Sequence, residues 1–170
     1  SLYDKRMINA KVVQVSSTLN DYLGGPSRVV VDTSLRFIKD FSEYKLLILG
    51  KNQYSFLENT ISVNMLFDNL YNFFLNPFKN NFYKIVRNAD VVIHHGFYLY
   101  STLLCALFIK KRVYIMPHGS LEPYQEREKK FLKLIFNFLF TIFTLNKKVI
   151  FLVATESEGK NVSQKYSSAE

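Results

Sequence analysis

Residues 11–28 read KVVQVSSTLNDYLGGPSR, and this stretch sets the order of elements for the whole chain. The apolar run at 11–15 predicts a buried strand. A polar segment at 16–22 predicts a loop that leads to a Gly-Gly pair. An amphipathic run at 29–41 follows and predicts a helix, because its apolar side chains recur at helical spacing. The predicted order is therefore strand, glycine-rich loop and helix.

The Gly-Gly pair allows two interpretations. Glycine has no Cβ, so Gly24 and Gly25 can adopt a positive φ and let a ligand reach backbone N–H groups. Ser27 is a good N-cap residue, and the free N–H groups at a helix N-terminus attract phosphate. The three residues together are typical of a phosphate site. The same residues also suffice for a tight turn between a strand and a helix, and their types do not separate the two interpretations.

The composition indicates a globular domain. The chain has 170 residues, of which 48% are hydrophobic and 21% are charged. We expect one domain over residues 1–170, with a core of substantial size. The single cysteine, Cys105, lies in an apolar run, which predicts a buried thiol. One cysteine allows no intrachain disulfide and offers no zinc ligand set, so no metal site is expected.

The net charge of +8 favours anionic partners. The lysines are scattered or stand at the ends of predicted helices, and no aromatic-basic RNA motif is present, so nucleic acid is not an expected partner. No signal peptide opens the chain, because Lys5 and Arg6 are followed by a strand. A cytoplasmic location is expected, with peripheral contact at the inner face of the membrane as an option.

Further apolar runs predict strands at 44–50, 89–96, 112–116 and 149–154, and helical patterns separate them. Strands that are apolar throughout and alternate with helices indicate a parallel sheet covered on both faces. The predicted fold is α/β, a Rossmann-like three-layer sandwich with a mostly parallel sheet. Ligands of such sheets bind beyond the carboxyl ends of the strands. We expect the glycine loop, His94-His95-Gly96 and Pro117-His118-Gly119 to share that rim.

Weaker signals complete the chain. A short strand is predicted at 60–63, and a helix at 64–75 that restarts at Asn76-Pro77. Thr155 and Glu158 match a capping box that opens a final helix, and we assign them no chemistry.

A long helix is predicted at 123–146, charged at its start and strongly apolar afterwards. Lys133 and Asn137 interrupt its apolar part, which is too short for a bilayer, so a membrane-spanning helix is rejected. We expect the later half to pack against the sheet because it carries too many apolar groups to leave in water. The side chains expected to be buried are Phe131, Leu132, Leu134, Ile135, Phe136 and Phe138.

Four segments in fixed order are similar to one known family. They are GGPSRVV at 24–30, DVVIHHG at 90–96, PHGSLEPY at 117–124 and ATESE at 154–158. Together they resemble the N-terminal, acceptor-side domain of a family-4 glycosyltransferase of the GT-B fold, over nearly the whole chain. The third segment, followed by a charged and then apolar helix, is the most specific.

The resemblance implies a retaining sugar transfer from a nucleotide-diphosphate sugar to a sugar or lipid-linked acceptor, with no metal or other cofactor. It also implies that a second Rossmann-like domain supplies most nucleotide contacts. That donor domain is missing from these 170 residues, so we expect the chain to be inactive alone.

The resemblance also assigns roles to residues. It implies that the donor diphosphate is bound by Gly24, Gly25 and Ser27, that His118 is the catalytic residue in the cleft, and that the acceptor side is lined by His95, Gly119 and Glu122. Ile93 replaces the first histidine of the family's strand-end motif, and alternation places His94 on the opposite face from His95. His95 and His118 also fit loop-bracing roles, and Glu122 also fits a carboxylate at a helix start.

Two rival functions remain. One is a stand-alone Rossmann-type module that binds an anion or a nucleotide. A dinucleotide site is disfavoured, because Gly-x-Gly-x-x-Gly is missing and no acidic residue ends the second strand. The other is a membrane-surface module that uses the basic surface and the helix start Lys129-Lys130-Phe131.

Overall fold

The sheet of the computed structural model has six strands, in the order β3-β2-β1-β4-β5-β6. The structure describes residues 8–17, 19, 25–50, 62–64, 81–121 and 129–166. Every strand pair within the sheet is parallel. The strands are β1 (Ile8–Ser16), β2 (Phe41–Ile48), β3 (Ser62–Asn64), β4 (Val91–His95), β5 (Arg112–Met116) and β6 (Lys148–Phe151).

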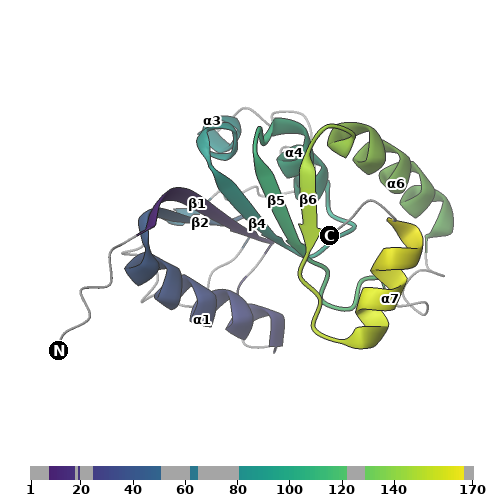
Figure 1. The fold of residues 1–170 in the computed structure, drawn as a ribbon, viewed down its shortest axis with the longest axis horizontal. Helices are drawn as coiled ribbons and strands as arrows, with labels where there is room; N and C mark the ends of the chain where they lie inside the picture. The colour runs from purple at the N-terminus through teal and green to yellow at the C-terminus, as the bar shows by residue number, and fades with distance from the viewer. Residues whose placement is uncertain are drawn as a thin grey trace.

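Helices cover both faces of this sheet (Figure 1). On one side lies α1 (Gly25–Asp40), and on the other lie α3 (Phe82–Asn88), α4 (Tyr100–Phe108) and α6 (Lys130–Thr144). The last helix is α7 (Glu156–Lys165). The predicted Rossmann-like three-layer sandwich is therefore confirmed.

The strand order contains a switch point between β1 and β4. The chain adds β2 and β3 on one side of β1, and then returns to the other side of β1 to add β4, β5 and β6. Where the winding reverses, the loops after the two central strands diverge and leave a crevice at their carboxyl ends. This topology places the carboxyl ends of β1 and β4 beside each other.

Two apolar cores fill the layers. The smaller lies under α1 and contains Leu19, Val30, Val31, Leu46 and Ile48. The larger lies under α3, α4 and α6, where Phe97 contacts the rings of Phe136, Phe140 and Phe151 with centroids 5.0–5.6 Å apart. Cys105 is buried in this larger core, as predicted.

Several element boundaries differ from those predicted. Helix α1 begins at Gly25, so Ser27 lies within its first turn and is not an N-cap. Strand β2 begins at Phe41 because its early residues pair with β1, where Lys11 and Glu43 form a 3.1 Å ion pair. The short strand expected at 60–63 is confirmed as β3. The predicted helix at 64–75 and its restart at 76–77 lie outside the described residues.

The predicted burial along α6 is wrong for five of its six side chains. Only Phe136 is buried, whereas Phe131 is 73% and Phe138 is 65% exposed. The helix packs through Phe136 and Phe140, one turn apart, and both contact the ring of Phe97. Because an α-helix has 3.6 residues per turn, the apolar side chains on its opposite side then face outward. The exposed residues that we expected to be buried are Phe131, Leu132, Leu134, Ile135 and Phe138.

Strand length falls toward the sheet edges. The central strand β1 has nine residues, whereas the two edge strands, β3 and β6, have three and four. Among the described residues, no helix is both long enough and apolar enough to cross a membrane.

Candidate functional site

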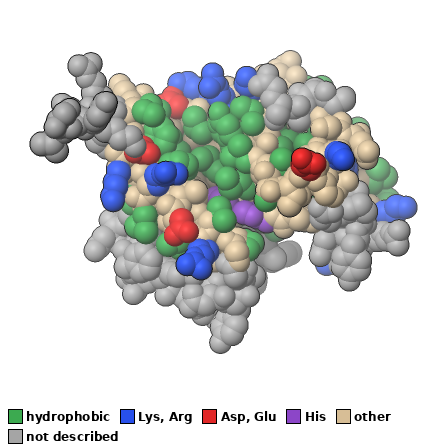
Figure 2. Space-filling view, turned by 60° about the horizontal axis from the view of Figure 1, so that its bottom comes forward, with side chains coloured by type: hydrophobic (Ala, Val, Ile, Leu, Met, Phe, Trp, Pro, Cys, Tyr) green, Lys and Arg blue, Asp and Glu red, His purple; other side chains and the backbone are tan. Residues whose placement is uncertain are grey.

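Two histidines meet at the carboxyl ends of β4 and β5. His95 is the last residue of β4, and His118 follows β5 by two residues. Nδ1 of His95 lies 2.9 Å from Nε2 of His118, within hydrogen-bond distance. His95 is buried and His118 is half-buried. Figure 2 shows histidine side chains at the surface beside hydrophobic ones. Of the two rings, that of His118 is the one partly exposed to solvent.

The turn that carries His118 has an unusual backbone. His118 has a φ of 52° and Gly119 a φ of 78°, both in the left-handed region. The turn closes where the Ser120 N–H donates to the Pro117 carbonyl at 3.2 Å, and the Ser120 hydroxyl donates to the same oxygen at 2.7 Å. A non-glycine residue with positive φ is uncommon and is concentrated at functional sites. The turn lifts the His118 ring toward His95.

Glu158 anchors this turn from α7. Its carboxylate accepts hydrogen bonds from the backbone N–H of Gly119 at 2.8 Å and of Ala154 at 3.0 Å. Thr155 is the N-cap of α7 as predicted, and its hydroxyl oxygen accepts from the Glu158 N–H at 3.1 Å. In an ordinary capping box the carboxylate would bond the N–H of the cap residue itself. Sequence reasoning missed that Glu158 instead reaches across to the histidine turn.

A buried polar network supports His95 from below. Gln14, in the middle of β1, is fully buried, and its Nε2 lies 2.7 Å from Nε2 of His95 and 2.8 Å from the Thr33 hydroxyl of α1. Its Oε1 accepts from Tyr44 at 2.7 Å and from Ser34 at 3.4 Å. Sequence reasoning missed Gln14. The sequence does contain a signal for it, because Gln14 is an uncharged amide among valines of a buried strand. A polar group buried in this way needs hydrogen-bond partners.

Burial keeps both rings neutral. It lowers the pKa of His95 to about 3, with smaller contributions from the neighbouring rings of His118 and His94. Burial also lowers the pKa of His118, while the Glu158 carboxylate opposes that shift. At neutral pH the pair therefore offers hydrogen bonds to a ligand and no positive charge.

His94 faces the other way, as alternation predicted. It is completely buried, with its Nδ1 3.0 Å from the Gly96 carbonyl oxygen and its Nε2 2.8 Å from the Ser101 hydroxyl. Burial lowers the pKa of His94 to about 4. These contacts tie the end of β4 to the first turn of α4. His94 is a bracing residue.

The other predicted site residues lie in part at the same edge. Gly25 and Ser27 form the first turn of α1, which follows β1 across the crevice from β4. Gly25 is not in the left-handed region, and a Cβ there would meet no atom within 4 Å. Gly25 therefore has room for a Cβ and does not use the positive φ that glycine permits, whereas Ser27 is buried. Gly24 and Glu122 lie outside the described residues.

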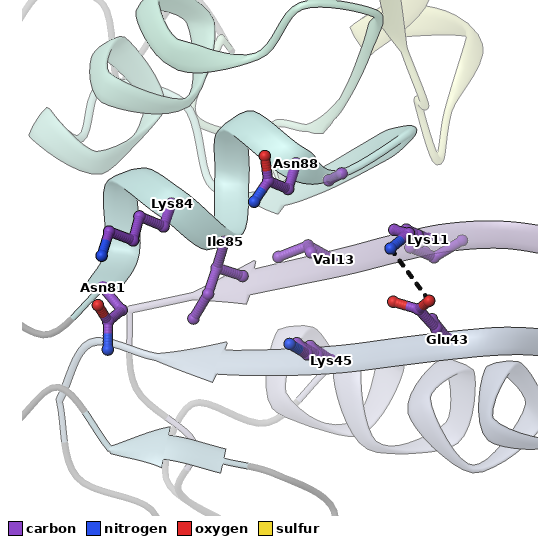
Figure 3. Close-up of a pocket in the computed structure, with 10 residues that line it drawn as sticks. Lys11, Val13, Glu43, Lys45, Asn81, Lys84, Ile85 and Asn88 are labelled. Atoms are coloured by element: carbon purple, nitrogen blue, oxygen red, sulfur yellow. Dashed lines mark ion pairs between the residues drawn. The ribbon is translucent and has the colours of Figure 1, made fainter.

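A separate cavity lies between α3 and the first halves of β1 and β2 (Figure 3). Its volume is about 370 Å³, and its lining includes the side chains of Lys11, Lys45 and Lys84. Neither His95 nor His118 lines it. Within the part of the chain that the structure describes, no group of three or more potential metal ligands comes together.

Comparisons with known protein families, curated proteins and solved structures found no match. The roles of the site residues consequently rest on the geometry and on the resemblance of the sequence motifs.

Proposed function

We propose that this chain is the acceptor-side half of a retaining, nucleotide-sugar-dependent glycosyltransferase. The observation that carries the proposal is the meeting of His95 and His118 at the carboxyl ends of β4 and β5, next to β1 and the α1 helix that follows it, where the winding of the sheet reverses. Crevices at this place in parallel sheets bind nucleotides and related ligands. The half-buried ring and the helix start offer the two kinds of group that a sugar diphosphate needs.

Each part of the crevice has a task in the proposed reaction. The bond between the anomeric carbon and the diphosphate oxygen breaks, and the nucleoside diphosphate leaves with the electron pair. The acceptor oxygen forms the new bond at that carbon with retained configuration, and the proton of the acceptor hydroxyl passes to the leaving phosphate oxygen. Backbone N–H groups at Gly25 and Ser27 face the diphosphate, where the helix dipole favours negative charge. His118 donates a hydrogen bond to a sugar or phosphate oxygen, and charge stabilisation of this kind is a large part of catalysis. The donor domain required for turnover is a separate Rossmann-like unit.

The test is a titration of the isotope-labelled chain with a nucleotide sugar such as UDP-glucose, followed by NMR. One ligand should perturb both the first turn of α1 and the His118 ring, without any sugar transfer. Gly25→Val should abolish the perturbation while the chain stays folded, because a Cβ at this position meets no atom within 4 Å. Lys39→Ala, at the far end of α1, is the matched control and should bind normally.

Other outcomes would reject the proposal. Turnover of the nucleotide sugar by the 170-residue chain would remove the need for a second domain. Binding of inorganic pyrophosphate as tightly as the nucleotide sugar, without any response at His118, would favour the stand-alone anion-binding module. Shifts confined to the lysines of the cavity under α3 would move the ligand to the opposite part of the sheet.

A second candidate function is contact of the exposed α6 stripe with an anionic membrane surface. Phe131, Leu134 and Phe138 recur at helical spacing on the outside of α6, and Ile142 and Leu145 continue the stripe. The exposed side chains of Lys129, Lys130 and Lys148 lie at its two ends. An apolar stripe with lysines beside it suits the interface of a bilayer that contains acidic lipids. This contact would bring a lipid-linked acceptor to the crevice.

Co-sedimentation with phosphatidylglycerol vesicles tests this contact. The double variant Phe131→Ser, Phe138→Ser should bind at least about 10-fold more weakly, because burial of a phenylalanine contributes about 1.5–3 kcal/mol. Leu35→Ser, on an exposed position of α1, is the control and should bind as the parent does. Equal binding by the double variant, or complete loss of parent binding in high salt, would exclude insertion of the stripe.

A further inference from the structure

The Gln14 side chain has its NH₂ group toward Thr33 and His95 and its carbonyl oxygen toward Tyr44. The Thr33 hydroxyl donates its hydrogen to the Val29 carbonyl at 2.6 Å, so its oxygen has only lone pairs to offer Gln14. The Gln14 atom facing it at 2.8 Å must therefore be the NH₂ group. On the other side, the Tyr44 hydroxyl lies 2.7 Å from the Gln14 atom that is left to be the carbonyl oxygen. The Tyr44 hydroxyl also lies 2.6 Å from the Ser34 hydroxyl oxygen and can donate its one hydrogen to only one of the two, so the Thr33 contact carries the assignment.

This orientation fixes the tautomer of His95. The second hydrogen of the Gln14 NH₂ points to Nε2 of His95 at 2.7 Å, so that nitrogen must accept. A ring whose Nε2 carries a lone pair is neutral and carries its proton on Nδ1. The Nδ1–H then donates to Nε2 of His118 at 2.9 Å.

The ring geometry supports a true hydrogen bond between the histidines. Their centroids are 5.2 Å apart, and the ring planes differ by only 14°. The centroid distance is about the sum of the N···N distance and the two ring radii. The two distances add up in this way only when both nitrogens lie on the line that joins the centroids. The rings are therefore edge to edge in one plane and not face to face. The Nδ1–H of His95 points along the lone pair of His118, as a strong bond requires.

The same logic reaches His118. Because its Nε2 accepts from His95, the neutral ring must carry its proton on Nδ1. Among the residues that the structure describes, none makes a hydrogen bond to this nitrogen, and the ring is half-buried at the crevice. The Nδ1–H of His118 is thus a donor available to a ligand.

We propose that Gln14 is a positioning residue that acts through His95 to hold His118 as a hydrogen-bond donor on Nδ1. Only the identity of the acceptor, an oxygen of a sugar or diphosphate, rests on the proposed function. Protonation of His118 at Nε2 would set two donors against each other. His95 could relieve this conflict only by moving its proton to Nε2, where the Gln14 NH₂ blocks it. The relay therefore disfavours the charged form of His118.

A glutamate at position 14 would reverse the relay. Its carboxylate would accept a hydrogen bond from Nε2–H of His95. The His95 ring would then either be neutral, with Nδ1 free to accept from His118, or be charged, with a proton on both nitrogens. Within the described part of the chain, the other charged and titratable groups facing the pair are Glu158, from α7, and His94, from β4. Both groups remain in place in a Gln14 variant. A change in the tautomer or the pKa of the two imidazole rings therefore reports on position 14.

The decisive measurement is ¹⁵N NMR of the imidazole rings in the 170-residue chain near pH 7. The chain has three histidines, so His94→Asn and His118→Asn suffice to assign them. We expect neutral rings at positions 95 and 118 with the proton on Nδ1. A proton on Nε2 of either ring, or a charged ring, would overturn the inference in the parent protein alone.

Two variants sharpen the result. Gln14→Glu should move the His95 proton to Nε2 or raise the pKa of the pair into the neutral range. Lys39→Ala, in the last turn of α1, is the control and should leave both tautomers unchanged. An unchanged His95 ring in a folded Gln14→Glu chain contradicts the relay.

Addition of UDP-glucose separates this inference from the proposed function. If the tautomers are as expected but the sugar nucleotide leaves the His118 ring unaffected, the relay stands and the glycosyltransferase assignment fails. If the His118 ring responds to the ligand but carries its proton on Nε2, the relay fails and the glycosyltransferase assignment stands.

Discussion

The paired substitutions Phe140→Ala and Phe138→Ala test which side of α6 packs on the protein. Phe140 is 1% exposed, and its ring lies 5.0 Å from Phe97, 5.8 Å from Tyr166 and 6.4 Å from Phe151, measured between centroids. Removal of a phenylalanine ring from such a core costs about 3–5 kcal/mol, since a cavity remains. Phe138 is two residues away on the same helix, so helix propensity changes equally in both variants.

The expected cost at Phe138 is much smaller. Only about a third of its side chain is covered, so the loss is about a third of the 1.5–3 kcal/mol for full burial, or roughly 0.5–1 kcal/mol. Urea unfolding followed by circular dichroism measures both values, and an unchanged m-value confirms that the two variants unfold from comparable states. Equal costs at the two positions, or a cost above about 3 kcal/mol at Phe138, would refute the packing described for α6.

Three further predictions concern stability and reactivity. The pKa of His94 is lowered from 6.5 to about 4 in the folded chain, so its contribution to stability, about 3 kcal/mol, is present above pH 6.5 and is lost as the pH falls toward 4. His94→Asn should make the fall of the urea midpoint across that range shallower but not abolish it, because the pKa of His95 is also lowered. Gly96→Ala should lower the melting temperature, because φ is 94° and the new Cβ would lie 2.8 Å from Cδ1 of Leu99. Gly159→Ala should raise the free energy of unfolding by about 0.5–1 kcal/mol, because glycine is less stable than alanine inside a helix such as α7. Calorimetry of the two variants distinguishes these effects. Burial raises the pKa of the Cys105 thiol, so a thiol reagent should label it only on unfolding, and rapid labelling under native conditions would contradict its place in the core.

The fold could be predicted because parallel strands buried on both faces leave a strong mark on a sequence. The run around Val12 and the run around Val92 are mostly apolar, and helical patterns separate them. Strand β5 matches its predicted bounds, Arg112–Met116, residue for residue. Boundaries were predicted less well where two elements join directly, as at Asp40 and Phe41, because no turn residue marks the change.

The site could be predicted only in part. His95 and His118 stand at strand ends, and parallel topology brings such positions together wherever they lie in the sequence. Gln14 and Glu158 were missed, because their partners are 81 and 39 residues away and are set by strand register and by the placement of α7. On α6, the sequence pattern contains two apolar stripes, and composition cannot tell which of them faces the protein.

The shortness of the two edge strands has a consequence for self-association. An edge strand exposes unpaired N–H and C=O groups, to which a strand from another molecule can add. Here the three residues of β3 and the four of β6 present only a short row of such groups at either border. Lys148 begins β6 and is exposed, which places a charge beside that row. Sheet extension from one copy to the next therefore has little backbone to pair with, and amyloid-like growth from the native state is disfavoured.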